Sequence, residues 1–356
     1  MAEIADEQVL AFRVAGHHLG RRTDALTAIG ACGIQQSPPG WAEVALRART
    51  NEDPDPGRVV MVNAMRGAPY LVPRADVAVF TRALMPAEED LRAIINSRET
   101  KEAREAGYTP REALDAVAGA AREALADGPL GRDDFHQALR ERLPDDLLPW
   151  CANCASHHVR PGFWRTLGPL GVTTMPERAT WELAEPVEFD LDQARAELAR
   201  RFLRCYGPGN HTELARWAQT APKHAKALFE LIADELDQVE TRAGRRWILA
   251  ADRKRLERPP KASGVRMLGG FDPYVSQPDR ETLVGDAKLR KRMFPAVGRP
   301  GVILDHGRLA GLWRGRKSGE TLAIELEWLG DPVELGREPA VVATARGCKD
   351  HHLVED

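Results

Sequence analysis

Two Gly-Pro pairs interrupt this sequence in the same local context, and they lie 79 residues apart. Gly128-Pro129 and Gly207-Pro208 each follow a stretch with helical periodicity, and each precedes an acidic residue that is followed by a large apolar one, Asp134-Phe135 and Glu213-Leu214. Glycine and proline interrupt regular structure, so each pair marks the end of one helix and the approach to another. The recurrence of this helix–break–helix pattern predicts duplicated supersecondary units rather than one continuous core.

The N-terminal part of the chain has a related order of elements. We expect three helices and then two strands: 6–19, 24–32 and 41–50, followed by 59–62 and 70–72. Asp6 is expected to cap the first helix, and Thr23 or Asp24 the second. Three helices followed by a hairpin form a winged helix.

Two later stretches repeat this order, and the last hundred residues differ in kind because they are rich in glycine and short β-type runs. The elements expected there are helices at 110–126, 133–141, 191–204, 212–219 and 222–236, and strands at 247–249, 301–304 and 322–328. The predicted fold class is α+β, with four segments. They are a first winged helix (1–85), a connector with a second winged helix (86–186), a third winged helix (187–256) and a C-terminal, mostly β, basic domain (257–356).

Bulk composition narrows the class of protein. At 356 residues the chain suggests several domains of roughly 100–200 residues each. The sequence has no apolar run long enough for a membrane span, and the N-terminus lacks the features of a secretory signal. Five cysteines, an odd number, favour reduced thiols, so we expect a cytoplasmic protein. No GxxxxGK[ST], GxSxG or HExxH motif occurs, which disfavours nucleotide hydrolysis, esterase and zinc-protease chemistry, and no cofactor is expected.

The net charge of −3 is not that of a simple nucleic-acid binder, but the basic residues are unevenly distributed. Between residues 280 and 317 ten bases stand against three acids, Glu281, Asp286 and Asp305. The bases are Arg280, Lys288, Arg290, Lys291, Arg292, Arg299, Arg308, Arg314, Arg316 and Lys317. We call this stretch the basic tract, and its composition favours contacts with phosphate groups over an ordinary solvated β surface.

Cysteine and histidine cluster in the stretch Cys151-x2-Cys154-x2-His157-His158, where the spacing of thiols and imidazoles resembles that of zinc ligands. Four ligands within eight residues would strain the loop, because zinc sites usually draw their second pair from a dozen or more residues away. We therefore expect no metal here, and we expect His157 or His158 to face a bound nucleic acid or to cap the next helix.

Five short blocks carry a resemblance to known proteins. They are Gly33-Ile34-Gln35-Gln36, Met65-Arg66-Gly67, the segment Cys151–Val159, Tyr206-Gly207-Pro208 and Phe271-Asp272-Pro273-Tyr274. Because these five blocks occur in this order along the chain, the sequence resembles the winged-helix DNA-binding superfamily that includes the AlkZ-like and YcaQ-like DNA glycosylases. The resemblance implies a C-shaped scaffold of three tandem winged helices with a C-terminal β domain, which takes up double-stranded DNA on its concave face.

The resemblance also implies catalytic residues. In the glycosylases a Gln-x-Gln or Gln-x-Asp motif positions the water that cleaves the N-glycosidic bond of a modified purine. Gln35 matches the first position, whereas the second falls on Ser37, with Gln36 between them. An N7-alkylated purine is a positively charged leaving group, so an oriented water could suffice without an acid. Neither glutamine nor serine is an effective base, and a general base contributes about 100- to 10,000-fold.

The expected site therefore combines Gln35, Gln36 and Ser37 as catalytic residues with a DNA-binding surface. That surface is expected to include Arg66, Tyr70, His157, His158, Tyr274, Arg280, Arg290, Lys291, Arg292, Arg314 and Arg316. Local alternatives stay open, since residues 35–40 also suit a plain interhelix loop and Tyr70 alternates with Val72 as a core residue would. The function expected first is a monomeric glycosylase that excises alkylated purines. The alternatives are a non-catalytic DNA-binding protein, such as a damage sensor or regulator, and a protein-interaction module.

Overall fold

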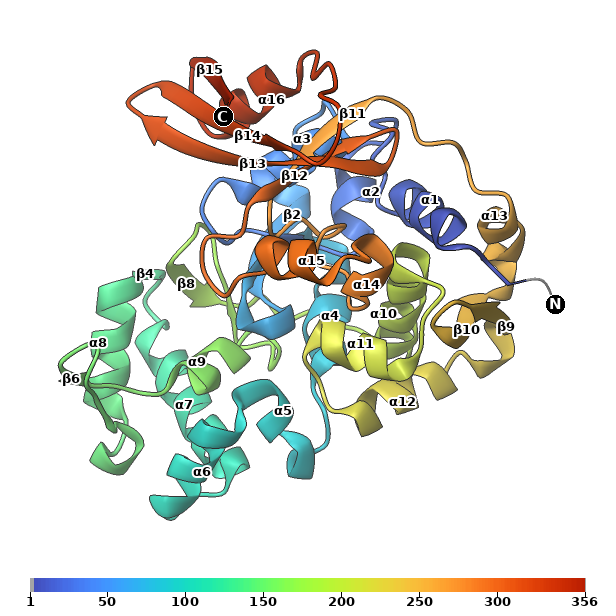
Figure 1. Cartoon of the computed structure of the whole chain (residues 1–356). Helices are drawn as coiled ribbons and strands as arrows, with labels where there is room; N and C mark the ends of the chain where they lie inside the picture. Colours follow the sequence, from blue (N-terminus) through green and yellow to red (C-terminus); the bar gives the residue numbers. More distant parts are fainter. Residues whose placement is uncertain (1–2, 356) are drawn as a thin grey trace. The chain divides into compact units, whose positions relative to one another are not determined.

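The computed structural model describes residues 3–355, whose helices and strands are drawn in Figure 1. The chain divides into two compact units. Unit 1 contains the chain up to Asp55, the segment Arg200–Glu213 and the chain from Ile232 onward. Unit 2 contains Pro56–Ala199 and Leu214–Leu231. The four segments predicted from the sequence repeats divide the chain differently from these two units. The four-segment division remains a prediction.

Unit 1 combines short helices with most of the long strands. Its helices are α1 (Asp6–Gly16), α2 (Ala25–Gly30), α3 (Trp41–Arg49), α13 (Arg253–Glu257), α14 (Arg280–Leu283), α15 (Ala287–Met293) and α16 (Glu338–Ala345). Its strands are β1 (Ile34–Gln35), β9 (Leu236–Thr241), β10 (Gly244–Leu249), β11 (Val265–Leu268), β12 (Gly301–Asp305), β13 (Arg308–Ser318), β14 (Thr321–Trp328) and β15 (Asp350–Glu355). Helices α10 (Leu191–Tyr206) and α11 (His211–Ala218) contribute residues to both units.

The C-terminal part of unit 1 is a five-stranded sheet in the order β11-β12-β13-β14-β15, drawn in orange and red in Figure 1. Neighbouring strands are antiparallel except for the parallel pair β14–β15. Successive side chains of a strand point to opposite faces. Val302 and Leu304 of β12 therefore pack in one cluster with residues of α14 and α15, and Ile303 packs in another with residues of α3 and α16. Because both faces are covered, β12 is a continuous apolar run.

Unit 2 is mainly helical, with short strands. Its helices are α4 (Val77–Phe80), α5 (Arg92–Ile95), α6 (Ser97–Glu105), α7 (Pro110–Ala124), α8 (Arg132–Arg142), α9 (Pro161–Thr166) and α12 (Pro222–Glu230). Its strands are β2 (Val59–Asn63), β3 (Pro69–Pro73), β4 (Leu130–Gly131), β5 (Trp150–Cys151), β6 (Ser156–His157), β7 (Thr173–Thr174) and β8 (Thr180–Leu183). One apolar cluster joins α7, α8 and α9 to Trp181 of β8. The antiparallel hairpin β2–β3 confirms the pair of strands predicted from residues 59–72.

Two local predictions were wrong. Asp6 lies inside α1, and Ala5 holds the N-cap position, where the Gln8 side chain accepts a hydrogen bond from the Ala5 amide at 3.0 Å. The helix predicted over 222–236 ends at Glu230, because Leu236 already pairs with Leu249 in the β9–β10 hairpin. The second cap prediction is confirmed, since Asp24 Oδ1 accepts from the Thr27 amide at 2.9 Å.

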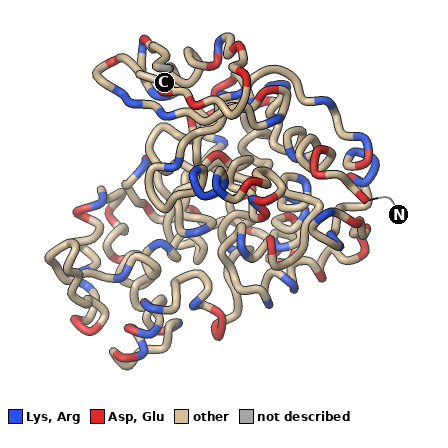
Figure 2. Tube along the Cα trace, in the orientation of Figure 1, with Lys and Arg blue, Asp and Glu red and all other residues tan. Residues whose placement is uncertain are grey.

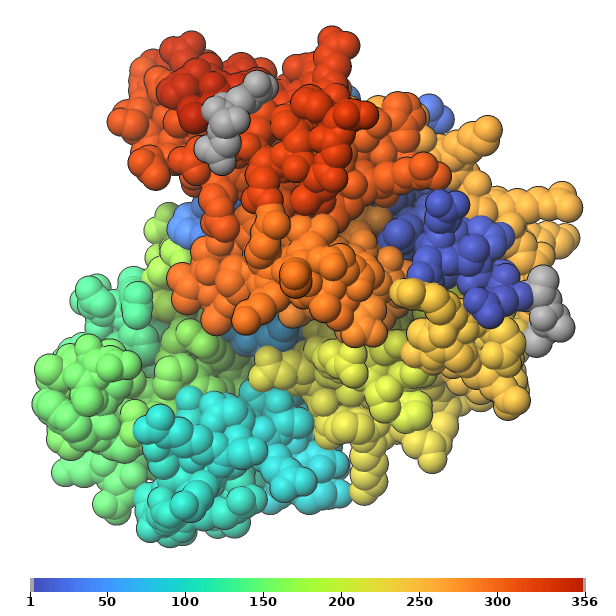
Figure 3. All heavy atoms as spheres, in the orientation of Figure 1, coloured from blue at the N-terminus to red at the C-terminus, as the bar shows by residue number. Residues whose placement is uncertain are grey.

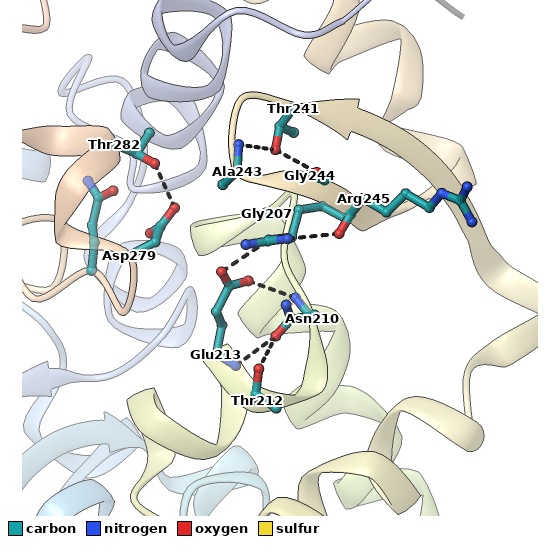
Figure 4. A network of polar contacts seen from close by, with 12 residues as sticks. Gly207, Asn210, Thr212, Glu213, Thr241, Ala243, Gly244, Arg245, Asp279 and Thr282 are labelled. Atoms are coloured by element: carbon teal, nitrogen blue, oxygen red, sulfur yellow. Dashed lines mark hydrogen bonds and ion pairs between the residues drawn. The ribbon is translucent and has the colours of Figure 1, made fainter. Parts of the chain in front are cut away.

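The break at Gly207-Pro208 leads into a well-defined helix start (Figure 4). Asn210 Oδ1 accepts a hydrogen bond from the Glu213 amide at 3.0 Å, and Glu213 Oε2 accepts one from the Asn210 amide at 2.9 Å. This reciprocal pair satisfies amides that the first turn of α11 leaves without helical partners. Arg246 Nε donates to Glu213 Oε1 at 3.1 Å, which ties the helix start to β10. The acidic residue after the break is therefore a structural cap.

The α+β class and the C-terminal sheet predicted from the sequence are confirmed. Within residues 3–355, none of the helices combines the length and the apolar character that crossing a membrane requires.

Candidate functional site

The predicted catalytic residues lie in unit 1, in a loop between α2 and α3 that we call the glutamine loop (Gly33–Gly40). Gly33 and Gly40 have φ angles of 70° and 81°, in the left-handed region that favours glycine, and Gly40 is the N-cap of α3. The Ile34 side chain between them is buried in the core. These two turns and one anchor fix the course of the loop.

Gln36 is used to hold the start of α3. Its Oε1 accepts a hydrogen bond from the Ala42 amide at 3.0 Å, and its Nε2 donates to Glu43 Oε1 at 2.7 Å. The first interaction satisfies an amide at the N-terminus of the helix, as a capping side chain does. Both ends of the Gln36 amide are therefore engaged, which argues against the catalytic role predicted for this residue.

Gln35 has a different environment from its neighbour. Its side chain is buried, and Nε2 donates a hydrogen bond to the backbone oxygen of Ser37 at 3.2 Å. Ser37, in the middle of the loop, is partly exposed. A buried, oriented amide is suited to hold a small polar molecule in one position, so Gln35 is the residue of the loop that best fits the predicted water-positioning role.

The hairpin residues predicted to contact DNA lie in unit 2. Arg66 is the tip of the β2–β3 hairpin, where its φ of 59° is unusual for a side chain of this size. Its Nη2 donates to the Tyr70 hydroxyl at 2.5 Å, and Asn63 Nδ2 donates to the Gly67 oxygen at 3.0 Å. Tyr70 is only 3% exposed, so the alternation with Val72 correctly indicated a buried ring, and stacking on a base would require it to move.

A small polar pocket lies beside Arg66, within unit 2, and we call it the Arg66 pocket. Its volume is about 110 Å³. The polar residues that line it are Arg66, Asn96, Glu99, Arg165, Thr166 and Gln219. Three of them, Arg66, Asn96 and Gln219, have positive φ angles of 59°, 101° and 54°. Backbone strain of this kind costs on the order of 1–3 kcal/mol per residue and concentrates at functional sites.

Burial changes the ionisation of the charged groups in this pocket. It raises the pKa of Glu99, whose carboxylate accepts a hydrogen bond from the Gly162 amide at 2.6 Å. It lowers the pKa of Arg165, whose guanidinium lies 5.2 Å from the Trp164 ring centroid. Ionisable groups with shifted pKa values that line the same pocket are typical of functional sites. Sequence reasoning missed Asn96, Glu99, Arg165 and Gln219, since nothing in their local pattern shows that they meet.

The two histidines of the Cys/His stretch point in different directions. His157 is exposed at the end of β6, opposite Trp150, and its Nδ1 lies 2.8 Å from the Leu148 oxygen. His158 is partly buried, with Nδ1 2.8 Å from the Val159 oxygen. His157 is therefore the one of the two that is placed to meet a partner molecule at the surface.

Tyr274 cannot contact DNA in this structure, so this prediction was wrong. Its side chain is completely buried, and its ring meets that of His17 edge-on at 5.6 Å. Burial also raises its pKa. The segment that contains it is held internally, because Asp272 pairs with the buried Arg49 at 2.8 Å. The Phe-Asp-Pro-Tyr block is thus a core element of unit 1.

The basic tract is exposed but partly neutralised. Figure 2 shows Lys and Arg positions grouped on α15, and Figure 3 shows the orange segment with α14 and α15 at the surface of the face in view. Arg280, Lys291, Arg292, Arg314 and Arg316 are exposed, and Arg290 is partly buried.

Carboxylates from inside and beyond the tract pair with three of these bases. Arg292 pairs with Glu327, Arg316 lies 3.6 Å from Glu325, and Arg290 lies 3.2 Å from Glu281. Strand β14 supplies two of these carboxylates. Because β14 lies outside residues 280–317, the composition of the tract could not predict that its bases are paired. Among the residues that the structure describes, Lys288, Lys291 and Arg314 of the tract have no carboxylate within ion-pair distance.

Comparison with known proteins defines the class to which this fold and these residues belong. The family model of the AlkZ-like DNA glycosylases matches residues 29–349. The match includes the glutamine loop, the Arg66 hairpin and the basic tract. The chain therefore belongs to the AlkZ-like DNA glycosylase family, which confirms the resemblance inferred from the sequence.

Two matches come from Streptomyces sahachiroi, a sequence and a solved structure. One, described as an interstrand DNA cross-link repair glycosylase, is 28% identical over 128 residues, which is 34% of this chain and 34% of the relative. The match thus spans about a third of the relative's length. The solved structure of the DNA glycosylase AlkZ superposes with a TM-score of 0.75 at 22% identity and covers 100% of both chains. This likeness shows that the two chains share a fold.

Proposed function

We propose that this protein is a monomeric DNA glycosylase that hydrolyses the N-glycosidic bond of alkylated purines in double-stranded DNA. Family membership supports the reaction class. One observation supports Gln35 as the residue that positions the water. Both ends of the Gln36 amide are hydrogen-bonded at the start of α3, whereas the Gln35 amide is buried and oriented.

The proposed chemistry relies on the substrate's own charge. Alkylation at N7 makes the purine a cationic leaving group, so departure needs no proton from the protein. Gln35 holds the water that attacks the sugar, and Ser37 borders that position. Glu43, whose carboxylate is hydrogen-bonded to Gln36, is the acid tied to this loop and is the candidate acceptor for the water proton.

The proposed DNA contacts are made by exposed and partly exposed residues, assigned within each unit by itself. Arg66 at the hairpin tip and the polar residues of its pocket are assigned to the lesion. His157, Arg280, Lys291 and Arg314 are assigned to the surrounding duplex, with Arg290, Arg292 and Arg316 contributing less because carboxylates already pair with them. We also propose that tandem winged-helix units, three in number, form the scaffold.

Base release from a defined duplex tests this function. The purified protein is incubated with duplex DNA that carries N7-methylguanine, and abasic sites are counted after alkaline cleavage. Wild-type protein should release the base and Gln35→Ala should not, whereas Gln137→Ala, a surface glutamine on α8, should act like wild type. A loss of rate in Glu43→Gln, with binding unchanged, would assign the proton acceptor. Release that persists undiminished in Gln35→Ala would refute the mechanism.

A second substrate follows from the relative's description as a cross-link repair glycosylase. A duplex joined through N7 of two guanines by a nitrogen mustard carries the same cationic leaving groups as N7-methylguanine. Unhooking of this duplex by wild-type protein, measured as conversion to single strands on a denaturing gel, would extend the substrate range to cross-links.

The alternative is a DNA-binding protein without catalysis, and one observation favours it. The loop offers no titratable side chain at either motif position, and Gln36 is occupied. Salt-dependent binding of the methylated duplex with no abasic sites, even after long incubation, would establish this alternative.

A further inference from the structure

The β5–β6 hairpin of unit 2 brings two cysteines and one histidine together. Cys151 pairs with Ser156 and Trp150 with His157 across the two strands. The turn between them is tight, since the Cys154 amide donates to the Cys151 oxygen at 3.2 Å and Ala155 has a φ of 47°. This turn carries Cys154 back towards Cys151.

The ligand atoms of Cys151, Cys154 and His158 all lie within 4.8 Å of one another. In a tetrahedral zinc site with Zn–S of about 2.3 Å and Zn–N of about 2.0 Å, sulfur atoms lie about 3.8 Å apart, and sulfur and nitrogen about 3.5 Å. The separations in the observed cluster, 4.8 Å at most, therefore need to contract by about 1.3 Å at most to hold the ion. Side-chain rotation of Cys154, which is exposed, can supply such a movement.

The orientation of His158 supplies an independent observation. Because Nδ1 lies 2.8 Å from a backbone oxygen, that of Val159, Nδ1 carries the proton and donates it. The lone pair is then on Nε2, which is buried without a hydrogen-bond partner in the structure. A metal-binding histidine usually has this arrangement, with one nitrogen fixed by a carbonyl and the other directed at the ion. A buried imidazole nitrogen beside two thiols, one of which interacts with His158, is placed to share an ion with them.

Strand alternation explains why only one of the two histidines takes part. Residues that pair across a hairpin share a face, so His157 lies with Trp150, on the face opposite Cys151. The objection from sequence, that four ligands within eight residues strain a loop, does not apply to three ligands. Three ligand atoms that converge are therefore compatible with a metal site, in contrast to the expectation from the sequence.

A second group, His17, Cys32 and Cys205 in unit 1, is a poorer candidate. All three side chains are buried, which leaves an ion no entry path. Cys205 Sγ already donates to the Ala31 oxygen at 3.4 Å, and Cys32 Sγ lies 3.7 Å from His17 Nδ1.

We propose that Cys151, Cys154 and His158 bind a zinc ion through two thiolates and one imidazole, with the fourth position open to water or to an external ligand. The two thiolates neutralise the charge of the ion, and their deprotonation releases protons on binding. The ion fixes the β5–β6 hairpin against the chain that leads into α9. It thereby orders Trp150, which is 54% exposed at the start of the hairpin.

Cobalt substitution tests this site in the full-length protein. The protein is stripped of metal, kept reduced and titrated with Co²⁺, which gives visible bands and thiolate charge-transfer bands when it is bound tetrahedrally through sulfur. One equivalent should saturate the bands, and Zn²⁺ should then abolish them by displacement. Zinc binding should also release protons at neutral pH and raise the Tm.

Variants locate the site and provide the matched control. Cys151→Ser and His158→Ala should weaken binding by more than about tenfold. His157→Ala, which changes the adjacent histidine on the other face, should bind as wild type does. Far-UV circular dichroism checks that each variant is folded. The proposal is overturned by absence of charge-transfer bands at one equivalent, by bands that survive Cys151→Ser, or by a Cys151–Cys154 disulfide that forms in preference to metal binding.

Discussion

Adjacent glutamines in this protein have different hydrogen-bond partners. The Gln36 side chain is hydrogen-bonded to the Ala42 amide and to the Glu43 carboxylate. We therefore expect the loss of Gln36 to destabilise the start of α3. Gln35 Nε2 donates to the Ser37 oxygen within the glutamine loop, and we expect the loss of Gln35 to reduce base release. The residue types are identical, and hydrogen-bond partners alone distinguish them.

Replacement of Gln36 by alanine should lower the free energy of unfolding by about 0.5–2 kcal/mol, the usual cost of removing a helix cap. Urea unfolding measures the change. Gln35→Ala serves as the comparison, because it should affect base release more than stability. Equal stability of Gln36→Ala and wild-type protein would show that the cap contributes nothing.

Glu213 gives the protein a pH-dependent contribution to stability. Burial raises the pKa of this carboxyl group, with Arg246 opposing the shift. The folded state thus holds the proton more tightly than the unfolded state, so the stabilising contribution is present below the ordinary carboxyl pKa and is lost as pH rises through the folded-state value.

Glu213→Gln should consequently become more stable relative to wild type as pH increases from about 4 to about 8, since glutamine cannot ionise. Differential scanning fluorimetry across this range gives the Tm difference. Asn210→Ala is the control, because it removes a capping partner of Glu213 without removing the titrating group. A Tm difference that does not change with pH would contradict the assignment.

At the scale of single elements, the short helix α15 carries four basic residues, and carboxylates of neighbouring elements pair with two of them. On this helix Arg292 pairs with Glu327 of β14 and Arg290 with Glu281 of α14. Within residues 3–355, Lys288 and Lys291 have no carboxylate within ion-pair distance. Paired bases must give up an existing partner before they bind phosphate, so the two lysines are better placed to release counterions from DNA.

The double variant Lys288→Ala/Lys291→Ala should bind duplex DNA more weakly and should reduce the salt dependence of log Kd by about one unit of slope per lysine. Fluorescence anisotropy at several salt concentrations measures the slope. Arg316→Ala should change it less, and Lys226→Ala, whose ammonium pairs with Glu230 on α12, is the control. An unchanged slope in the double variant would remove α15 from the DNA surface.

At the scale of the whole molecule, each unit is assembled from separate stretches of chain. Unit 2 takes Leu214–Leu231 from beyond a segment of unit 1. This stretch is integral to its packing, because Thr220 Oγ1 donates to the Leu84 oxygen at 3.0 Å and His224 Nε2 lies 2.8 Å from the Ala83 oxygen.

A fragment of residues 56–199 should therefore be less stable than one of residues 56–231, although it contains most of unit 2. Loss of α12 exposes apolar surface and removes the hydrogen-bond partners of buried carbonyl groups. Each buried carbonyl left without a partner costs about 1–3 kcal/mol of stability. Thermal unfolding followed by circular dichroism compares the two fragments. Equal Tm values would show that the later stretch is dispensable.

Local chemistry explains which parts of the fold could be predicted. The cap at Asp24, the β2–β3 hairpin and the helices on either side of Gly207-Pro208 depend on neighbours in sequence, and they were predicted correctly. The end of α12 and the burial of Tyr274 depend on partners far along the chain, and they were not.

The sequence by itself determined the α+β class, the family and the position of the glutamine loop, because these follow from local periodicity and from short motifs that need no distant partner. Only the tertiary structure decided which side chains are available. It engaged Gln36 as a cap, buried Tyr274, brought carboxylates of β14 to the basic tract and gathered Cys151, Cys154 and His158. The physical reason is that burial, ion pairing and ligand convergence depend on distances between residues that the order of the chain does not specify.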